Sequence, residues 1–211
     1  ILDRDPKGAE TADEIRRAGG RAAFVQVDVS DREALTAAIQ NAGQVDILVT
    51  SAAILEKRSI LESSMEDFDR TMDTNIHGVM NAVQAVIPGM KAQGGGKIVI
   101  LSSMASFLGR ADQAAYAAAA GTLTGFTRNA AVRLGQFGIR VNSIAPGIID
   151  TDFPESLKDE PEYREFRVHF TPLQRIGKPE DVTGAAIFLA SDAAAYVNGY
   201  TLAVDGGWLA R

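Results

Sequence analysis

A strand-length apolar run, followed by a loop and a long alanine-rich helix, constrains the fold of this chain more than any other feature. The run K-I-V-I-L-S-S spans residues 97–103, and helix-forming residues follow a short loop and continue to Gly135. Alanine and leucine are strong helix formers, and Gly135 and Gly138 are natural C-terminal stops. This strand–loop–helix unit should place the hydroxyl of Ser103, at the strand end, close to the phenol of Tyr116 on the first helical turn.

The alternation of strand and helix continues along the whole chain. Apolar runs of strand length recur at 1–3, 22–27, 46–50, 98–101, 139–144 and 200–204. Helical patterns occupy the intervals at 6–18, 30–39, 64–90, 116–135 and 179–189. Alternating strands and helices form right-handed βαβ units, and continuous apolar runs indicate a sheet buried on both faces. The sequence therefore predicts an α/β fold with a doubly wound parallel sheet.

Local signals predict how several of these helices begin and face. Ser30 has the side chain of an N-cap, and the segment from Ser64 to Asp67 has the pattern of a capping box. Pro179 suits the first position of a helix. In the first helix, Ile15 is expected to face inward.

Length and composition indicate one domain and exclude several classes of protein. Residues 1–211 should form a single domain, with the polar segment 151–175 as a small lobe outside the main layers. The net charge of −6, without a basic cluster, argues against nucleic acid as a partner. No apolar run reaches the roughly 18 residues of a transmembrane helix, so no membrane partner is expected. The chain has no cysteine, which fits the reducing cytoplasm, and His77 and His169 lack metal-ligand spacing.

Ser103 and Tyr116 carry a resemblance to a known family. Taken alone, a serine at a strand end and a tyrosine in an alanine-rich helix are more often structural. Their spacing, however, resembles that of the short-chain dehydrogenase/reductases, whose Tyr-x-x-x-Lys opens this helix. The resemblance implies a Rossmann-like three-layer αβα fold and an oxidoreductase that interconverts a small secondary alcohol and a ketone with a nicotinamide cofactor. It implies that Tyr116 is the acid/base, Ser103 orients the substrate oxygen and Asn75 serves the proton relay.

Further matches lie where that family binds its cofactor. The segment from Pro146 to Thr151 matches the Pro-Gly turn that contacts the nicotinamide amide, and Asp28-Val29 matches the pair that contacts adenine. The residues implied at the cofactor are Asp3, Asp28, Val29, Ala52, Tyr116, Pro146, Gly147, Ile149 and Thr151. At the end of its strand, Asp3 would accept hydrogen bonds from ribose hydroxyls and repel a 2′-phosphate, which favours NAD over NADP. The neighbouring Arg4 keeps NADP open, because a guanidinium there could pair with the phosphate.

Three departures from the family pattern bear on activity. The glycine-rich phosphate loop has no counterpart in the chain, and Gly94–Gly96 cannot replace it because it precedes a strand. The family's Asn-Asn-Ala-Gly reads T-S-A-A at 50–53. Ala120 stands in place of the lysine, whose ammonium would hold the nicotinamide ribose and lower the tyrosine pKa from about 10. These departures motivate a second hypothesis, a catalytically impaired relative that acts as a binding or assembly subunit, and a third, an active parent altered at these positions.

The resembling fold has a further strand between the strands at 1–3 and 46–50. Neighbouring strands lie about 4.8 Å apart, so without it two rows of backbone groups would be unpaired. We therefore expect an N-terminal segment to precede Ile1.

The resemblance also implies an assembly and a substrate class. Helices 75–91 and 116–134 should pack against their copies in a homodimer, and the C-terminal strand and tail would complete a homotetramer. Their outer faces are rich in small and apolar residues, as a buried surface should be. An apolar or modest polyol substrate is expected from the residues that could line the pocket, which are Phe107, Ile148, Ile149, Phe153, Leu157 and Phe166.

Overall fold

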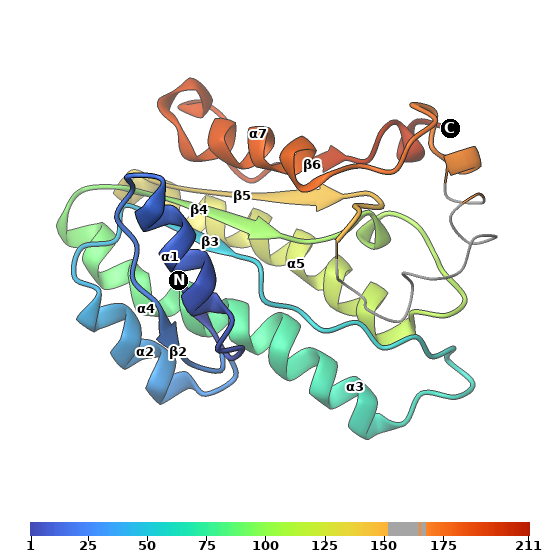
Figure 1. The fold of residues 1–211 in the computed structure, drawn as a ribbon, viewed down its shortest axis with the longest axis horizontal. Helices are drawn as coiled ribbons and strands as arrows, with labels where there is room; N and C mark the ends of the chain where they lie inside the picture. The colour runs from blue at the N-terminus through green and yellow to red at the C-terminus, as the bar shows by residue number, and fades with distance from the viewer. Residues whose placement is uncertain (152–164, 166–167) are drawn as a thin grey trace.

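The computed structural model describes residues 1–151, 165 and 168–211, and strands alternate with helices throughout this part (Figure 1). The strands are β1 (Leu2–Asp3), β2 (Val25–Gln26), β3 (Ile47–Thr50), β4 (Gly96–Leu101), β5 (Ile139–Pro146) and β6 (Thr201–Val204). The longer helices are α1 (Gly8–Arg17), α2 (Arg32–Asn41), α3 (Met65–Met72), α4 (Gly78–Ala92), α5 (Ala114–Leu134) and α7 (Pro179–Ala190). The predicted α/β alternation is confirmed. The expected lobe at 151–175 lies mostly outside the described residues.

The main sheet is parallel and lies between two helix layers. Its strand order is β3-β4-β5-β6, and every pairing in it is parallel. Along β4, side chains alternate between the two faces. Ile98 and Ile100 join the core beneath α4 and α5, whereas Val99 joins the core beneath α7. Figure 1 shows α7 on one side of β4 and β5, with α4 and α5 on the other.

A gap separates this sheet from a small two-stranded one. β1 pairs with β2, and neither strand is hydrogen-bonded to β3. A cavity of about 340 Å³ lies between them, lined by Leu2 and by Ile47 and Val49 of β3. The prediction that β3 is buried on both faces is wrong. Ile47 and Val49 are 46% and 48% exposed, because they face this gap.

Two predictions about helix ends and faces are also wrong. The N-cap of α2 is Asp31, whose carboxylate accepts from the Ala34 amide at 3.0 Å. Ser30 instead donates its hydroxyl to Asp28 at 2.7 Å. In α1 the buried residue is Ala12, while Ile15 is 39% exposed, its side chain lying over the chain reversal after the helix.

Other local predictions are confirmed. Ser64 and Asp67 form the capping box of α3, and Pro179 begins α7. The helix that follows α3 carries a feature that the sequence did not indicate, a π-helical stretch at Asp73–His77. Such stretches interrupt α-helices mostly at functional sites. In the described part of the chain, no helix is long and apolar enough to span a membrane.

Candidate active site

A cavity of about 510 Å³ opens at the carboxyl ends of β3, β4 and β5. Its lining residues are Val49, Ser51, Ala53, Leu101, Ser102, Ser103, Tyr116, Pro146, Gly147, Ile149, Thr151, Pro179, Val182 and Thr183. Ligands of open parallel α/β sheets bind outside the carboxyl ends of the strands. The structure thus brings six of the residues named from the sequence into one cavity: Ser103, Tyr116, Pro146, Gly147, Ile149 and Thr151.

Ser103 and Tyr116 meet in the wall of this cavity. Ser103 follows β4, and its Oγ accepts from the backbone N–H of Ala105 at 3.2 Å. Its hydroxyl proton therefore remains available, and both Ser103 and Tyr116 line the cavity, where the Ser103 side chain acts on the Tyr116 phenol and lowers its pKa. Tyr116 lies in the first turn of α5, as the spacing of 13 residues predicted. The pair can hold and protonate one oxygen atom of a ligand.

The environment of Tyr116 favours its neutral form. The side chain is half-buried, and removal of water disfavours a phenolate. Burial raises the pKa of Tyr116 above the ordinary value of a phenol, and the hydrogen bond from Ser103 opposes this only in part. At neutral pH the phenol is therefore a proton donor.

Ala120 lies one helical turn beyond Tyr116 and brings no charge to the site. It is 4% exposed, and its carbonyl accepts from Ser102 Oγ at 3.1 Å. Lys97 Nζ lies 3.4 Å from Asp192, and Lys91 Nζ lies 4.2 Å from the centre of the Phe137 ring. Neither lysine takes part in the Ser103–Tyr116 pair, as the sequence indicated.

Asn75 lies in the π-helical stretch, behind the cavity rather than in its lining. The side chain is 4% exposed. Its Oδ1 accepts from the Ile54 N–H at 2.8 Å, and its Nδ2 donates to the Ile54 carbonyl at 2.9 Å. In this structure, Asn75 holds the backbone that leaves β3.

The turn after β5 forms the opposite wall. A Cβ atom at Gly147 would lie 2.7 Å from Asp205 Cα, so this close approach requires glycine. The next residues are held by Gly177, whose N–H donates to the Ile148 carbonyl at 2.9 Å and whose carbonyl accepts from the Asp150 N–H at 2.8 Å. These bonds place Ile149 in the cavity wall.

The residues expected at the adenosine lie apart from this cavity. Asp3 is the last residue of β1, and its Oδ1 accepts from the Asp5 N–H at 2.9 Å. Asp28 Oδ1 accepts from both the backbone and the hydroxyl of Ser30, and these bonds, with a smaller contribution from Arg4, lower the pKa of Asp28. Val29 and Ala52 line the 340 Å³ cavity between the two sheets.

Several lining residues were not named from the sequence. Ser51 and Ser102 are next to Ala52 and Ser103, which were expected at the site, and this adjacency was the only sign in the sequence that they line the cavity. Val182 and Thr183 come from α7, far along the chain, and reach the cavity only through the packing of α7 on the sheet. Among the described residues, no group of three or more His, Asp or Glu side chains is placed to hold a metal ion.

The amino-acid sequence is similar to those of known proteins over almost its whole length. Residues 1–209 match the family described as "Enoyl-(Acyl carrier protein) reductase". The L-rhamnose 1-dehydrogenase (NAD(P)(+)) of Azotobacter vinelandii is 39% identical over 201 residues, which are 93% of this chain and 78% of that protein. The chain belongs to the short-chain dehydrogenase/reductase family. A second member, the cyclopentanol dehydrogenase of Comamonas sp., is 37% identical over 97% of this chain and 83% of its own length.

Solved structures of family members confirm the Rossmann-like fold. A putative gluconate dehydrogenase from Agrobacterium tumefaciens has a TM-score of 0.95 at 36% identity, covering 100% of this chain and 86% of its own. A gluconate 5-dehydrogenase from Burkholderia cenocepacia, in complex with NADP and tartrate, has the same score and identity, with 100% and 85% covered. All four relatives are dehydrogenases by name, the L-rhamnose enzyme is named as NAD(P)(+)-dependent and the gluconate 5-dehydrogenase was solved with NADP, which supports a general oxidoreductase assignment.

Proposed function

We propose that this short-chain dehydrogenase/reductase interconverts a secondary alcohol and a ketone by hydride transfer with a nicotinamide cofactor. The observation that carries the proposal is that Ser103 and Tyr116 both line a 510 Å³ cavity at the carboxyl edge of the sheet. In carbonyl reduction, Tyr116 gives its proton to the substrate oxygen while Ser103 donates a hydrogen bond to it. In oxidation the phenolate form of Tyr116 removes the hydroxyl proton.

The cavity wall suits a nicotinamide ring, which would supply or accept the hydride. Pro146 and Gly147 line the cavity, and the lack of a Cβ at Gly147 lets this turn lie directly against Asp205. Ile149 and Thr151 continue this wall, and we propose that they hold the carboxamide side of the ring. Asn75, by binding Ile54, supports the segment at the cavity's other side.

The proposed cofactor is NAD rather than NADP. One oxygen of Asp3 accepts from the Asp5 amide, which leaves the other to accept from ribose hydroxyls. Arg4 supports the alternative, because its guanidinium lies 4.0 Å from Asp28 and its side chain is 62% exposed, free to meet a 2′-phosphate. The solved relatives that carry NADP give this alternative weight.

A second candidate is a binding or assembly subunit without useful turnover. The uncharged Ala120 and the raised pKa of Tyr116 favour it, because both keep the phenol protonated. Titration with NADH followed by turnover assays in both directions separates the two. Binding with turnover supports the dehydrogenase, and binding without turnover in either direction supports the subunit. Failure to bind either NADH or NADPH contradicts the dehydrogenase.

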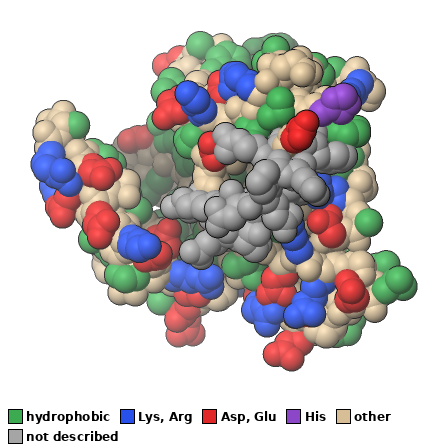
Figure 2. Space-filling model, turned by 45° about the vertical axis from the view of Figure 1, so that its right-hand side comes forward, with side chains coloured by type: hydrophobic (Ala, Val, Ile, Leu, Met, Phe, Trp, Pro, Cys, Tyr) green, Lys and Arg blue, Asp and Glu red, His purple; other side chains and the backbone are tan. Residues whose placement is uncertain are grey.

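The proposed substrate is a small alcohol or ketone, apolar or polyol. The cavity combines apolar walls from Val49, Leu101 and Val182 with hydroxyl groups such as Ser51 and Thr183. Of the residues expected to line it, Phe153, Leu157 and Phe166 lie outside the described residues. On the face shown in Figure 2, acidic and basic side chains are interspersed, and we do not propose nucleic acid as a partner.

We propose that the chain assembles through α4 and α5 as a homodimer or homotetramer. Ala118, Thr122 and two glycines, Gly121 and Gly125, form an exposed small-residue face on α5. A Cβ atom built at either glycine meets no other atom within 4 Å, so a second helix could approach this face closely. A cytoplasmic location stays a prediction from the absence of cysteine.

A further inference from the structure

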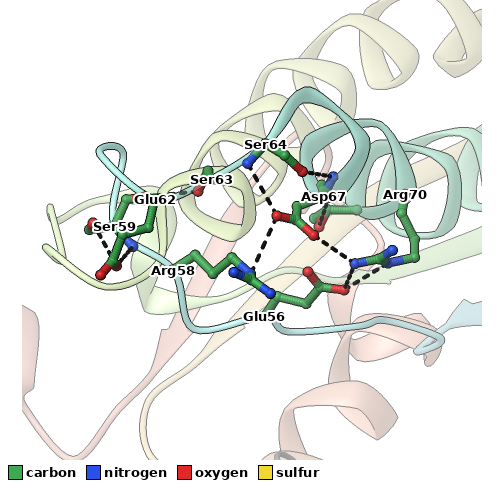
Figure 3. A network of polar contacts seen from close by, with 9 residues as sticks. Glu56, Arg58, Ser59, Glu62, Ser63, Ser64, Asp67 and Arg70 are labelled. Atoms are coloured by element: carbon green, nitrogen blue, oxygen red, sulfur yellow. Dashed lines mark hydrogen bonds and ion pairs between the residues drawn. The ribbon is translucent and has the colours of Figure 1, made fainter.

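Arg70 is at the centre of a network of charged side chains beside the candidate site (Figure 3). Its Nε donates to Glu56 Oε1 at 2.7 Å, and its NH2 group donates to Asp67 Oδ1 at 2.9 Å. The other oxygen of Asp67 lies 3.3 Å from Arg58 Nε. Acidic and basic groups therefore alternate from Glu56 through Arg70 and Asp67 to Arg58.

This network connects a loop to a helix whose start is fixed by a capping box. Glu56 and Arg58 belong to the segment after β3, whereas Asp67 and Arg70 belong to α3. Asp67 also accepts from the Ser64 backbone N–H as part of the capping box, so its position is set by the start of α3. The Asp67 side chain is only 14% exposed, which reduces the screening of its ion pairs by water.

The loop segment 54–58 contacts two sides of the candidate site through its end residues, Ile54 and Arg58. Asn75 holds Ile54 by both of its backbone groups. At the other end, the Arg58 carbonyl accepts from the Ala114 N–H at 3.3 Å, and Arg58 forms a parallel bridge with Gln113. Ala114 is the first residue of α5, two positions before Tyr116. The segment thus links the π-helical stretch to the helical turn that carries the phenol.

We infer that Arg70 is a positioning residue of this site, which fixes segment 54–58 against α3 and through it holds the first turn of α5 in place. The role of Tyr116 in the reaction rests on the proposed function, but the mechanical link does not. A single exposed ion pair contributes little to stability, so the effect of Arg70 should appear in the geometry of the site more than in unfolding.

The test compares Arg70→Gln with a matched control, Arg16→Gln. Arg16 pairs with Asp13 on α1, far from the cavity, and the two arginine side chains are similarly exposed, at 49% and 48%. In Arg70→Gln we expect kcat to fall about tenfold with little change in the KM for the cofactor, because small misplacements of reacting groups slow the chemical step. Arg16→Gln should leave both constants unchanged.

Hydrogen–deuterium exchange gives a readout that needs no turnover. Peptides that contain 54–58 and 113–116 should both exchange faster in Arg70→Gln, and neither should do so in Arg16→Gln. Glu56→Gln removes the same ion pair from the loop side and leaves α3 intact, so it replaces Arg70→Gln should that variant fail to fold. The kcat of the variant that carries both substitutions should be no lower than that of Arg70→Gln alone, because Arg70→Gln already removes the ion pair with Glu56.

The outcomes separate the two proposals. Unchanged exchange at 113–116 in both Arg70→Gln and Glu56→Gln would overturn the inference, even if the loop itself loosened. Unchanged kcat in an enzyme that turns over would overturn it as well. If the protein binds NADH without turnover, the dehydrogenase proposal fails, while the exchange comparison still decides whether Arg70 positions the start of α5.

Discussion

At Tyr116, burial and hydrogen bonding act on the phenol in opposite directions, and burial has the larger effect. The raised pKa means that the proton is already in place for carbonyl reduction, whereas alcohol oxidation must first remove it. A cationic group beside the phenol would reverse this balance, because it stabilises the phenolate. Ala120, one turn away, brings no such group to the phenol.

Ala120→Lys should therefore improve alcohol oxidation more than carbonyl reduction. Each unit by which the ammonium lowers the Tyr116 pKa is worth about 1.4 kcal/mol, or tenfold in phenolate at neutral pH. Oxidation by the unaltered chain should keep rising from pH 7 to 10, and in Ala120→Lys the rise should occur at lower pH. Rates in both directions across that range check this.

Ala120→Met is the control for this experiment, since it adds a long side chain without a charge. It should not raise oxidation at pH 7. Equal oxidation rates at pH 7 for Ala120→Lys and the unaltered chain would show that the lysine role does not apply here.

We expect the choice between NAD and NADP to depend on two single residues, Asp3 and Arg4. Calorimetry should show tighter binding of NAD than of NADP. Asp3→Ala should weaken the binding of NAD and should remove the repulsion of the 2′-phosphate of NADP. Arg4→Ala, the matched substitution at the neighbouring residue, should weaken the binding of NADP and leave that of NAD unchanged. Equal or tighter NADP binding by the unaltered chain would transfer the dominant role to Arg4.

Among the elements, the start of α7 illustrates how one helix end supports a wall of the cavity. Asp181 accepts from the two terminal nitrogens of Arg175 at 2.6 and 2.8 Å and from the Lys178 N–H at 2.7 Å. The Arg175 hydrogen bonds, followed by that from the Lys178 backbone, hold the pKa of Asp181 far below its usual range. Gly177, between these two residues, carries the hydrogen bonds that hold Ile148 to Asp150.

Asp181→Asn should lower thermal stability in a pH-dependent manner. A carboxylate whose pKa is depressed in the folded state stabilises the protein above its unfolded pKa of about 3.9, and this contribution is lost as pH falls through the folded pKa. The difference in Tm between the two proteins should be constant near neutral pH and shrink below about pH 4. Asp192→Asn, at a side chain that is 94% exposed, is the control and should show little difference at any pH. A difference for Asp181→Asn that persists unchanged in acid would contradict this account.

At the scale of the whole molecule, the small-residue face of α5 and the gap between the sheets are two exposed surfaces of the described chain. Parallel sheets are normally covered on both faces, so the half-exposed Ile47 and Val49 are unusual positions for such side chains. The exposed glycines of α5 differ from Ile47 and Val49, because close packing of α5 against a second copy of the chain would bury them without rearrangement.

Light scattering at micromolar concentration should give the mass of a dimer or tetramer. Gly121→Leu adds a side chain that meets nothing within its own chain, so it should shift the mass towards a single chain while leaving the circular dichroism spectrum unchanged. Gln40→Leu, on the exposed surface of α2, should leave the mass unchanged. A single-chain mass for the unaltered protein would exclude this assembly.

The prediction of the fold depended on contacts between residues close in sequence. The capping box at Ser64, the start of α7 at Pro179 and the continuous apolar run of β4 each report interactions within a few residues, and each is confirmed. At the start of α2 the local pattern favoured Ser30 as the N-cap, whereas the structure uses the adjacent Asp31.

The sequence by itself determined the α/β class, the family and the approach of Ser103 to Tyr116, because periodicity and spacing act along a single strand and helix. Only the tertiary structure decided which distant groups meet. Asn75 binds Ile54, 21 residues earlier, and Arg70 binds Glu56, 14 residues earlier. Likewise α7 brings Thr183 into the cavity, and the gap beside β3 exposes Ile47. These contacts depend on how elements pack across the sheet, a relation that no local pattern of residues records.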